Sequence, residues 1–401
     1  MLPEFDAPPL CLKSNENGCR LVVGFVDGTI RFYDTTKEEK FIELWKFQTK
    51  SSVRGVDIDE VRKRIYAVTK NRALCVFDMN TGKRIRCILR CHTGIPTAIC
   101  TLPPTALKSQ QLATADETGE VKTWNLDSQV SVKHVVVRKW NEQSEDINDL
   151  KVDVKSNLLA PSSDGTIGAY DLRKAKFKVR SELMHSELFA VCPTNRSVYV
   201  GGEDGYVEVF NLNEYGNLLE RIESGFEMGV NGIVELRDSL LGITSQGSNK
   251  MRLLNVKPSK RLGFVGCHGD EKSEDDGIDG ITISGDKSTV FTMIALSGTI
   301  KKWDMRPIVA KIPILRAQDA KSKKGRKLDG FFDGMAHNNE EEEQDSDDND
   351  SDNDEPSSKK RRHQNSDDDD EEVDDEEGDD EDPEDEEDSG DEEHVEEEDS
   401  D

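Results

Sequence analysis

The stretch GTIKKWDMR, residues 298–306, contains a pattern that recurs throughout the chain. Three related stretches lie upstream: GTIRFYD (28–34), GTIGAYDLR (165–173) and GYVEVFN (205–211). In each of them a glycine precedes a short run that ends on an aromatic residue followed by Asp or Asn. A glycine turn that leads into a run of β-prone residues is typical of a β-hairpin. The recurrence therefore indicates a repeat built on one hairpin.

Alignment on the closing dipeptide gives seven hairpin segments. They end at Asp34, Asp78, Asn125, Asp171, Asn211, Asn255 and Asp304. Successive ends lie 44, 47, 46, 40, 44 and 49 residues apart, and a period of this length fits four-stranded blades arranged around an axis. The sequence thus predicts an all-β, seven-bladed β-propeller over residues 1–315. Positive φ angles are expected at four turn glycines: Gly28, Gly165, Gly205 and Gly298.

The closing dipeptides resemble those of the WD-repeat family. Six of them stand at the family's Trp–Asp position: Tyr33–Asp34, Phe77–Asp78, Trp124–Asn125, Tyr170–Asp171, Phe210–Asn211 and Trp303–Asp304. The sixth repeat along the chain has Leu254–Asn255 instead. Closure of the ring requires a last pairing, because an open ring leaves sheet edges exposed. The segment LPEFDAP (2–8) is the predicted outer strand of the blade that contains Trp303.

The resemblance also implies a hydrogen-bonded set of four residue types: a His, a Ser or Thr, a turn Asp and the Trp. The turn acid is retained at Asp27, Asp164 and Asp204, but we expect no repeat to hold all four types. Three histidines lie in predicted inter-blade loops, where the resemblance implies a structural hydrogen bond: His92, His185 and His268.

Charge divides the chain into a body and a tail. Between Glu340 and Asp401 there are 38 Asp and Glu against 4 Lys and Arg, whereas the preceding residues hold 45 acidic and 49 basic side chains. The acidic segment has no aromatic residue and too little apolar surface to offset chain entropy. We therefore expect a basic linker at 316–337 and a disordered acidic tail at 338–401.

Linker and tail carry several candidate contact sites. The basic run KSKKGRK could contact RNA phosphates or a partner through Lys321, Lys323, Lys324, Arg326 and Lys327. Phe331 and Phe332 form an apolar island that either docks on the propeller or anchors a partner. A compact basic run is expected to bind a nuclear import receptor: Lys359, Lys360, Arg361 and Arg362. Five serines followed closely by acids are candidates for phosphorylation: Ser346, Ser351, Ser366, Ser389 and Ser400.

The sequence favours a binding protein over an enzyme. It contains none of the common phosphate-loop, zinc-protease or serine-hydrolase motifs, so we expect no catalytic residues and no cofactor. Its eight cysteines include no C-x-x-C pair, and Cys87, Cys91 and His92 are only a weak metal signal without a fourth ligand. Scattered thiols, no signal peptide and no long apolar run predict a reducing compartment and no membrane.

Taken whole, the chain resembles the WD repeat-containing protein 55 family of nucleolar propellers linked to ribosomal RNA production. The order of five features carries this resemblance: the early start PEFDAPPLCLKSNENGCRLVVGFVDGTIRFYD, the seven hairpins, KSKKGRK, DGFFDGM and the acidic end. It implies a nucleolar scaffold in ribosome biogenesis, especially of the large subunit. Its implied partners are pre-ribosomal proteins, assembly factors and pre-ribosomal RNA.

A second resemblance suggests another class of function. Tyr170-Asp171-Leu172-Arg173 and Trp303-Asp304-Met305-Arg306 are similar to the box of cullin-4 ubiquitin-ligase substrate receptors. Arginine suits such an interface because its guanidinium binds carboxylates through two hydrogen bonds. Arg173 and Arg306 are thus candidate contacts with the ligase adaptor, although in that class the boxes usually occupy neighbouring repeats.

Overall fold

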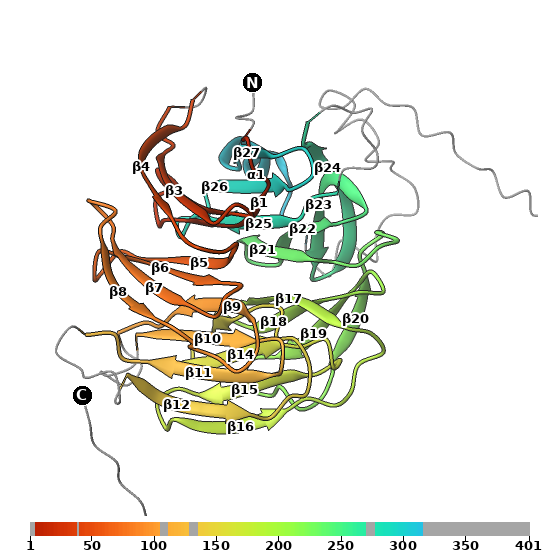
Figure 1. Cartoon of the computed structure of the whole chain (residues 1–401). Coiled ribbons are helices and arrows are strands. Elements are labelled where there is room, and N and C mark those ends of the chain that lie inside the picture. Colours follow the sequence, from red (N-terminus) through yellow and green to blue (C-terminus); the bar gives the residue numbers. More distant parts are fainter. Residues whose placement is uncertain (1–4, 38–39, 105–110, 128–134, 270–276, 316–401) are drawn as a thin grey trace, which may run out of the picture. The chain divides into compact units, whose positions relative to one another are not determined.

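Each of the seven predicted hairpins forms the middle of an antiparallel sheet. The computed structural model describes residues 5–37, 40–104, 111–127, 135–269 and 277–315. These residues form seven sheets arranged as the blades of a propeller (Figure 1). The all-β, seven-bladed architecture predicted from the sequence is therefore confirmed.

The first three blades follow one another in chain order. Blade 1 contains β1 (Pro9–Ser14), β2 (Arg20–Phe25), β3 (Thr29–Asp34) and β4 (Ile42–Gln48). Blade 2 contains β5 (Val53–Asp59), β6 (Arg64–Thr69), β7 (Leu74–Asp78) and β8 (Arg84–Ile88). Blade 3 contains β9 (Pro96–Thr101), β10 (Leu112–Asp116), β11 (Glu120–Trp124) and β12 (Val136–Asn141).

The remaining blades keep the same order. Blade 4 contains β13 (Lys151–Val152), β14 (Asn157–Pro161), β15 (Ile167–Asp171) and β16 (Lys176–Arg180). Blade 5 contains β17 (Leu188–Pro193), β18 (Ser197–Gly202), β19 (Tyr206–Asn211) and β20 (Glu220–Glu223). Blade 6 contains β21 (Gly232–Arg237), β22 (Leu240–Ser245), β23 (Ser248–Val256) and β24 (Ser259–Cys267). In the described residues blade 7 contains β25 (Gly280–Ile283), β26 (Thr289–Ile294) and β27 (Thr299–Asp304), followed by α1 (Arg306–Lys311).

The ring closes between blades 7 and 1. Strand β1 contacts β5 on one side and β25 on the other. Lys302 donates from Nζ to the Thr35 carbonyl at 2.7 Å, which ties β27 to the first blade. Phe5 N–H donates to the Gly298 carbonyl at 3.0 Å. Phe5–Pro8 form no strand, and residues 2–4 of the predicted closing strand lie outside the described residues.

The turn glycines adopt the predicted left-handed conformation. Their φ angles are 85° at Gly28, 75° at Gly165, 79° at Gly205 and 63° at Gly298. The same conformation recurs in blade 3 at Gly119, with φ 81°, and in blade 2 at Arg72, with φ 61°. Blade 2 therefore forms the same turn with a residue other than glycine, although a side chain with a Cβ makes the left-handed conformation less favourable.

Aromatic residues of the closing dipeptides pack between blades. The ring of Tyr170 in blade 4 lies 5.0 Å from that of Trp140 in blade 3. Phe77 in blade 2 lies 4.8 Å from Phe47 in blade 1. Burial of one such side chain contributes about 1.5–3 kcal/mol. The repeated dipeptide thus marks the contact that fastens each blade to its neighbour.

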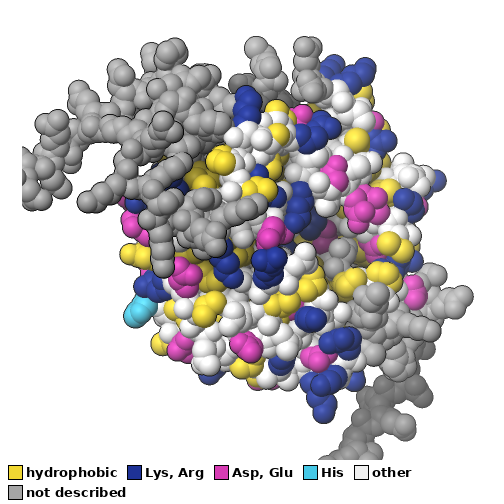
Figure 2. All heavy atoms as spheres, turned by 180° about the vertical axis from the view of Figure 1, so that it is seen from behind, with side chains coloured by type: hydrophobic (Ala, Val, Ile, Leu, Met, Phe, Trp, Pro, Cys, Tyr) yellow, Lys and Arg dark blue, Asp and Glu magenta, His cyan; other side chains and the backbone are white. Residues whose placement is uncertain are grey.

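The chain divides into two units, Met1–Asn339 and Glu340–Asp401. The predicted linker and tail, residues 316–401, lie outside the described residues, and so do the domain limits predicted for them. No helix in the described part has the length and apolarity needed to cross a bilayer. On the side of the molecule shown in Figure 2, basic, acidic and hydrophobic side chains are interspersed.

Candidate functional site

Arg173 and Arg306 are the predicted contact residues that the structure describes. Arg173 is exposed in the turn after β15, where one oxygen of Asp171 accepts the backbone N–H groups of Arg173 and Lys174, each at 3.0 Å. Arg306 begins α1 and holds Asp304 with two hydrogen bonds, Nε to Oδ1 at 2.9 Å and Nη2 to Oδ2 at 3.0 Å. The two arginines follow the third strands of blades 4 and 7, so the structure does not bring them together.

The other candidate residues lie in residues 316–401, outside the described part of the chain. They are the linker residues Lys321, Lys323, Lys324, Arg326, Lys327, Phe331 and Phe332, the basic run at 359–362, and the five tail serines. They stay predictions.

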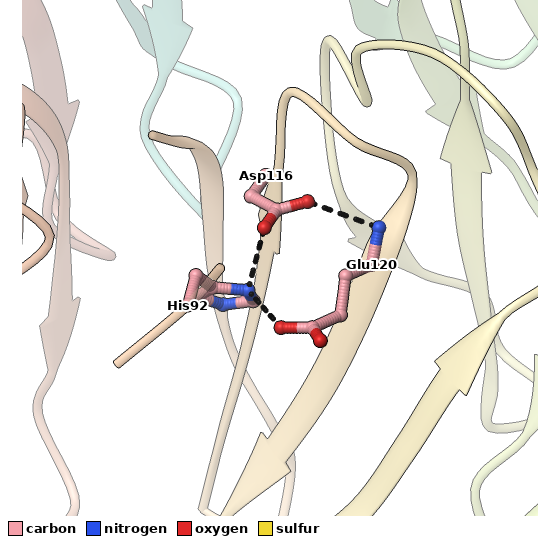
Figure 3. A group of neighbouring side chains, drawn as sticks. All are labelled: His92, Asp116 and Glu120. Carbon is pink, nitrogen blue, oxygen red and sulfur yellow. Dashed lines mark hydrogen bonds and ion pairs between the residues drawn. The ribbon is translucent and has the colours of Figure 1, made fainter. Parts of the chain in front are cut away.

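Blade 3 holds the four-residue set that we expected to be missing. Thr114 Oγ1 lies 2.7 Å from the indole Nε1 of Trp124 and 2.6 Å from Nε2 of His92. The other ring nitrogen of His92 lies 3.4 Å from Asp116 Oδ2 (Figure 3). The expectation was wrong because the acid is Asp116, two positions earlier in the repeat than the turn acid of blades 1, 4 and 5. His92 therefore makes the structural hydrogen bond that the family resemblance implied.

Glu120 lies close to this set, and together with His92 and Asp116 it could in principle provide ligands for a metal ion. Ligand atoms of His92, Asp116 and Glu120 lie within 4.8 Å of one another, and all three side chains are buried. His92 Nδ1 is 2.9 Å from Glu120 Oε2, and Lys122 Nζ is 2.5 Å from the same oxygen. Lys139 pairs with the second carboxylate oxygen of Glu120. Two ammonium groups already supply the positive charge, so the geometry favours a structural network over a cation site.

The pKa values of the carboxyl groups agree with this network. Burial acts to raise the pKa of Asp116, but hydrogen bonds from His92, Thr118 and Gly94 lower it overall. Burial also acts to raise the pKa of Glu120, and Lys122, Lys139 and His92 reverse that effect. Both groups are therefore held as carboxylates.

Blade 7 repeats three of the four members. Thr292 Oγ1 lies 2.9 Å from Trp303 Nε1 and 2.7 Å from His268 Nδ1. The second nitrogen of His268 lies 3.1 Å from the Thr299 hydroxyl, which takes the place of the acid. Burial, with a contribution from Lys301, lowers the pKa of His268 to about 3. His185, the third predicted loop histidine, is exposed.

An acidic face covers the turns and inter-blade loops of blades 3 to 6. We define it by Glu117, Glu145, Asp146, Glu187, Glu203 and Glu227. Two of these residues lie in turns between second and third strands, and the other four lie in loops that enter the next blade. Glu203 N–H donates to the Glu187 carbonyl at 2.9 Å, so blades 4 and 5 contribute adjacent members.

The carboxylates of the acidic face act on one another. Burial first, and then the charges of Glu117, Glu187 and Glu145, raise the pKa of Asp146. Arg54 opposes this shift. None of the ion pairs between described residues includes a carboxylate of the acidic face. Negative charge therefore accumulates here and Arg54 offsets it only in part, as at a surface that attracts cations.

A pocket of about 300 Å³ opens within the acidic face, between blades 5 and 6. The residues that line it include Glu203, Glu227, Phe189 and Met228. Met228 is 62% exposed. A lysine or arginine side chain suits such a pocket, because its stem packs on apolar groups while its charged end meets carboxylates.

The central channel is larger, and its three lysines are paired with acids. It has a volume of about 520 Å³ and is lined by the first strands of the blades. Three lysines at its wall pair with acids: Lys13 with Asp57 at 3.3 Å, Lys151 with Asp149 at 2.8 Å, and Lys287 with Glu235. The channel therefore leaves fewer unpaired charges for a charged partner to bind than the acidic face does.

The acidic face is hard to recognise in the sequence because its members are more than 100 residues apart at the extremes. A signal was present: the loops QSEDIND (143–149), HSELF (185–189) and FEMGV (226–230) each place an acid shortly before a first strand. The closing dipeptides alone do not reveal this similarity between the loops.

The proteins that are similar to this chain in sequence carry the WD-repeat name, in agreement with the propeller fold. No family model matches the chain. It is 26% identical over 274 residues to WD repeat-containing protein 55 of Mus musculus, covering 67% of this chain and 68% of the relative. It is 27% identical over 335 residues to the Bos taurus protein of that name, covering 79% and 81%. With a WD repeat-containing protein 55 homolog of Dictyostelium discoideum it shares 22% identity over 268 residues, covering 66% and 62%. The chain is a seven-bladed WD-repeat protein that resembles WD repeat-containing protein 55.

Proposed function

We propose that this protein is a non-enzymatic binding platform in nucleolar ribosome biogenesis, where it holds basic proteins of the pre-ribosome. The observation that carries the proposal is the acidic face, with the pocket whose lining includes Glu203, Glu227, Phe189 and Met228. Its carboxylates are fixed on the turns of a closed β-structure, and no catalytic group is needed to explain them. The resemblance of the sequence to a nucleolar family supports the nucleolus as the place where the protein acts.

The physical basis is charge complementarity. Ribosomal proteins are rich in Lys and Arg, and a concentrated negative surface speeds their encounter and disfavours acidic competitors. Phe189 and Met228 add apolar contact for the stem of one basic side chain. The proposed client therefore presents an extended basic segment that crosses the face from blade 3 to blade 6.

The rest of the chain has supporting roles in this proposal. The basic run Lys359–Arg362 brings the protein to the nucleus through an import receptor. The tail and its serines, once phosphorylated, add further negative charge for basic clients. The linker run 321–327 contacts pre-ribosomal RNA through phosphates, and this contact should weaken steeply with salt.

The test compares affinity purifications from cells. The double variant Glu203→Lys and Glu227→Lys reverses the charge at the pocket. The matched control, Glu43→Lys and Glu220→Lys, makes the same charge change at exposed positions on the outer strands β4 and β20. We expect ribosomal proteins and pre-ribosomal RNA with the intact protein and the control, and their loss with the pocket variant.

A parallel sample that lacks residues 338–401 separates the two acidic regions. Loss of the clients with this truncation, but not with the pocket variant, would move the contact from the propeller to the tail. Retention of all clients by the pocket variant would contradict a role for the acidic face.

The alternative function is that of a cullin-4 substrate receptor. It is favoured by the exposed position of Arg173, beside a turn that Asp171 holds through two backbone N–H groups. Arg173→Glu with Arg306→Glu should then abolish co-purification of the ligase adaptor, whereas Lys176→Glu, at an exposed position of β16, should not. Recovery of the adaptor without pre-ribosomal material would favour this function over ribosome biogenesis.

A further inference from the structure

Two cysteine thiols face each other across the outer edge of blade 2. Cys75 on β7 and Cys87 on β8 are direct partners in the antiparallel register. Their sulfur atoms are 3.3 Å apart. The other described thiol contacts go to backbone carbonyls, as from Cys11 to Val53 at 3.8 Å and from Cys19 to Asn17 at 3.6 Å.

The backbone already suits a disulfide between these two residues. Directly opposed residues of an antiparallel pair have Cα atoms about 4.5–5.5 Å apart. A disulfide spans Cα separations of about 4.4–6.8 Å. Closure therefore needs only small side-chain rotations, and both strands can keep their register.

The two thiols differ in their access to solvent. Cys75 is 3% exposed and belongs to the core cluster on which Trp45 and Phe47 pack. Burial first, and then contact with Cys87, raise the pKa of Cys75 to about 12. Cys87 is only half-buried on the outermost strand. An oxidant in solution therefore reaches Cys87 first, and Cys75 is placed to respond to it.

We propose that Cys75 and Cys87 form a reversible redox site that closes to a cross-strand disulfide on reaction with hydrogen peroxide. The Cys87 thiolate attacks one peroxide oxygen; an S–O bond forms, the O–O bond breaks, and the leaving hydroxide takes up a proton as water. The Cys75 sulfur then attacks the Cys87 sulfur of the sulfenic acid. An S–S bond forms, the S–O bond breaks, and the Cys75 proton leaves with the hydroxide as a second water.

The disulfide acts on an exposed sheet edge. Strand β8 pairs only with β7 among the strands of its blade. A covalent link at its fourth residue restrains the local opening to which edge strands are prone. Oxidation therefore stabilises blade 2 near the loop that leads to His92, and reduction removes this restraint on β8.

Peptide mapping of the full-length protein tests the site. The reduced protein is treated with hydrogen peroxide, its remaining thiols are blocked with N-ethylmaleimide in urea, which unfolds the chain and exposes Cys75, and it is digested with trypsin. Cys75 then lies in ALCVFDMNTGK (73–83), and Cys87 lies in CILR (87–90). The expected product is these two peptides joined, with loss of the joined form on addition of a reductant.

Three variants complete the test. Cys87→Ser should abolish the joined peptide, and Cys75→Ala should leave a sulfenic acid on Cys87 that dimedone traps. Cys19→Ser, at a half-buried cysteine whose thiol contacts a backbone carbonyl, should change neither result. The proposal is overturned if wild-type Cys87 joins instead to CHTGIPTAICTLPPTALK (91–108), which carries Cys91, or if Cys75 remains open to N-ethylmaleimide after Cys87 is oxidised.

Discussion

The buried hydroxyl of Thr114 accepts the indole N–H of Trp124 across the second and third strands of blade 3, at 2.7 Å. The same hydroxyl lies 2.6 Å from a ring nitrogen of His92. One oxygen atom thus joins two strands to the loop that enters the blade. Because this site is closed to water, loss of the oxygen would leave two buried nitrogens without a partner.

Thr114→Val should therefore destabilise the protein. Each buried group left unsatisfied costs about 1–3 kcal/mol, while valine keeps the shape of the side chain. Urea denaturation measures the change in the free energy of unfolding. Thr123→Val is the matched control, since Thr123 is equally buried but its hydroxyl has no hydrogen-bond partner among the described residues. Equal losses in the two variants would contradict the role given to Thr114.

The sequence predicted the fold well because one dipeptide marks one buried contact in each repeat. Tyr170 and Phe77 are conspicuous in the sequence for the same reason that they pack between blades: large aromatic side chains fasten neighbouring sheets. The four-residue set of blade 3 was missed because Asp116 stands two positions from the place where the turn acid was sought. The register of the strands determines which acidic residue contacts His92, and the spacing of residues along the sequence does not reveal that register.

The candidate site was much less predictable than the fold. Glu117 and Glu187 act on Asp146 from different blades, and only the packing of consecutive blades makes them neighbours. The contact of Cys75 with Cys87 likewise depends on the pairing of β7 with β8. The sequence suggested Cys87 together with Cys91 and His92 as a weak metal signal, but His92 is engaged by Thr114 and Glu120.

Phe5 should be needed for the stability of the closed ring. Its ring lies 5.2 Å from that of Phe25 and 5.9 Å from that of Tyr33, and its N–H binds the Gly298 carbonyl. Phe5→Ala should lower the free energy of unfolding by about 2 kcal/mol, since the ring is only partly buried. Leu89→Ala, at a side chain that is 71% exposed, should have little effect. Thermal denaturation of the two variants side by side would show whether the start of the chain fastens blade 1 to blade 7.

His268 should make stability depend on pH. Its pKa is lowered from 6.5 to about 3 by burial and by Lys301, so the folded protein holds it neutral while the unfolded chain takes up a proton. The stability from the neutral form is complete above about pH 6.5 and is lost as the pH falls toward 3. The loss approaches about 1.4 kcal/mol for each pH unit. Unfolding free energies between about pH 7 and pH 5 should fall more steeply for the wild type than for His268→Gln. Parallel curves for the two proteins would refute the assignment.

Two turn glycines with the same backbone should differ in their tolerance of a side chain. Gly165 and Gly205 have φ angles of 75° and 79°, so alanine costs about 1–2 kcal/mol at either position from the left-handed conformation alone. A Cβ at Gly165 would lie 3.3 Å from a methyl group of Leu183, which can move, and 3.3 Å from the backbone oxygen of Met184, a contact that is tight but needs only a small shift. At Gly205 it would lie 2.2 Å from the backbone oxygen of Phe226, which is fixed between blades 5 and 6. Gly205→Ala should therefore lower the free energy of unfolding by about 2 kcal/mol more than Gly165→Ala, because overpacking adds to the strain. Urea denaturation of both variants measures the difference, and equal costs would show that the turn conformation alone requires glycine there.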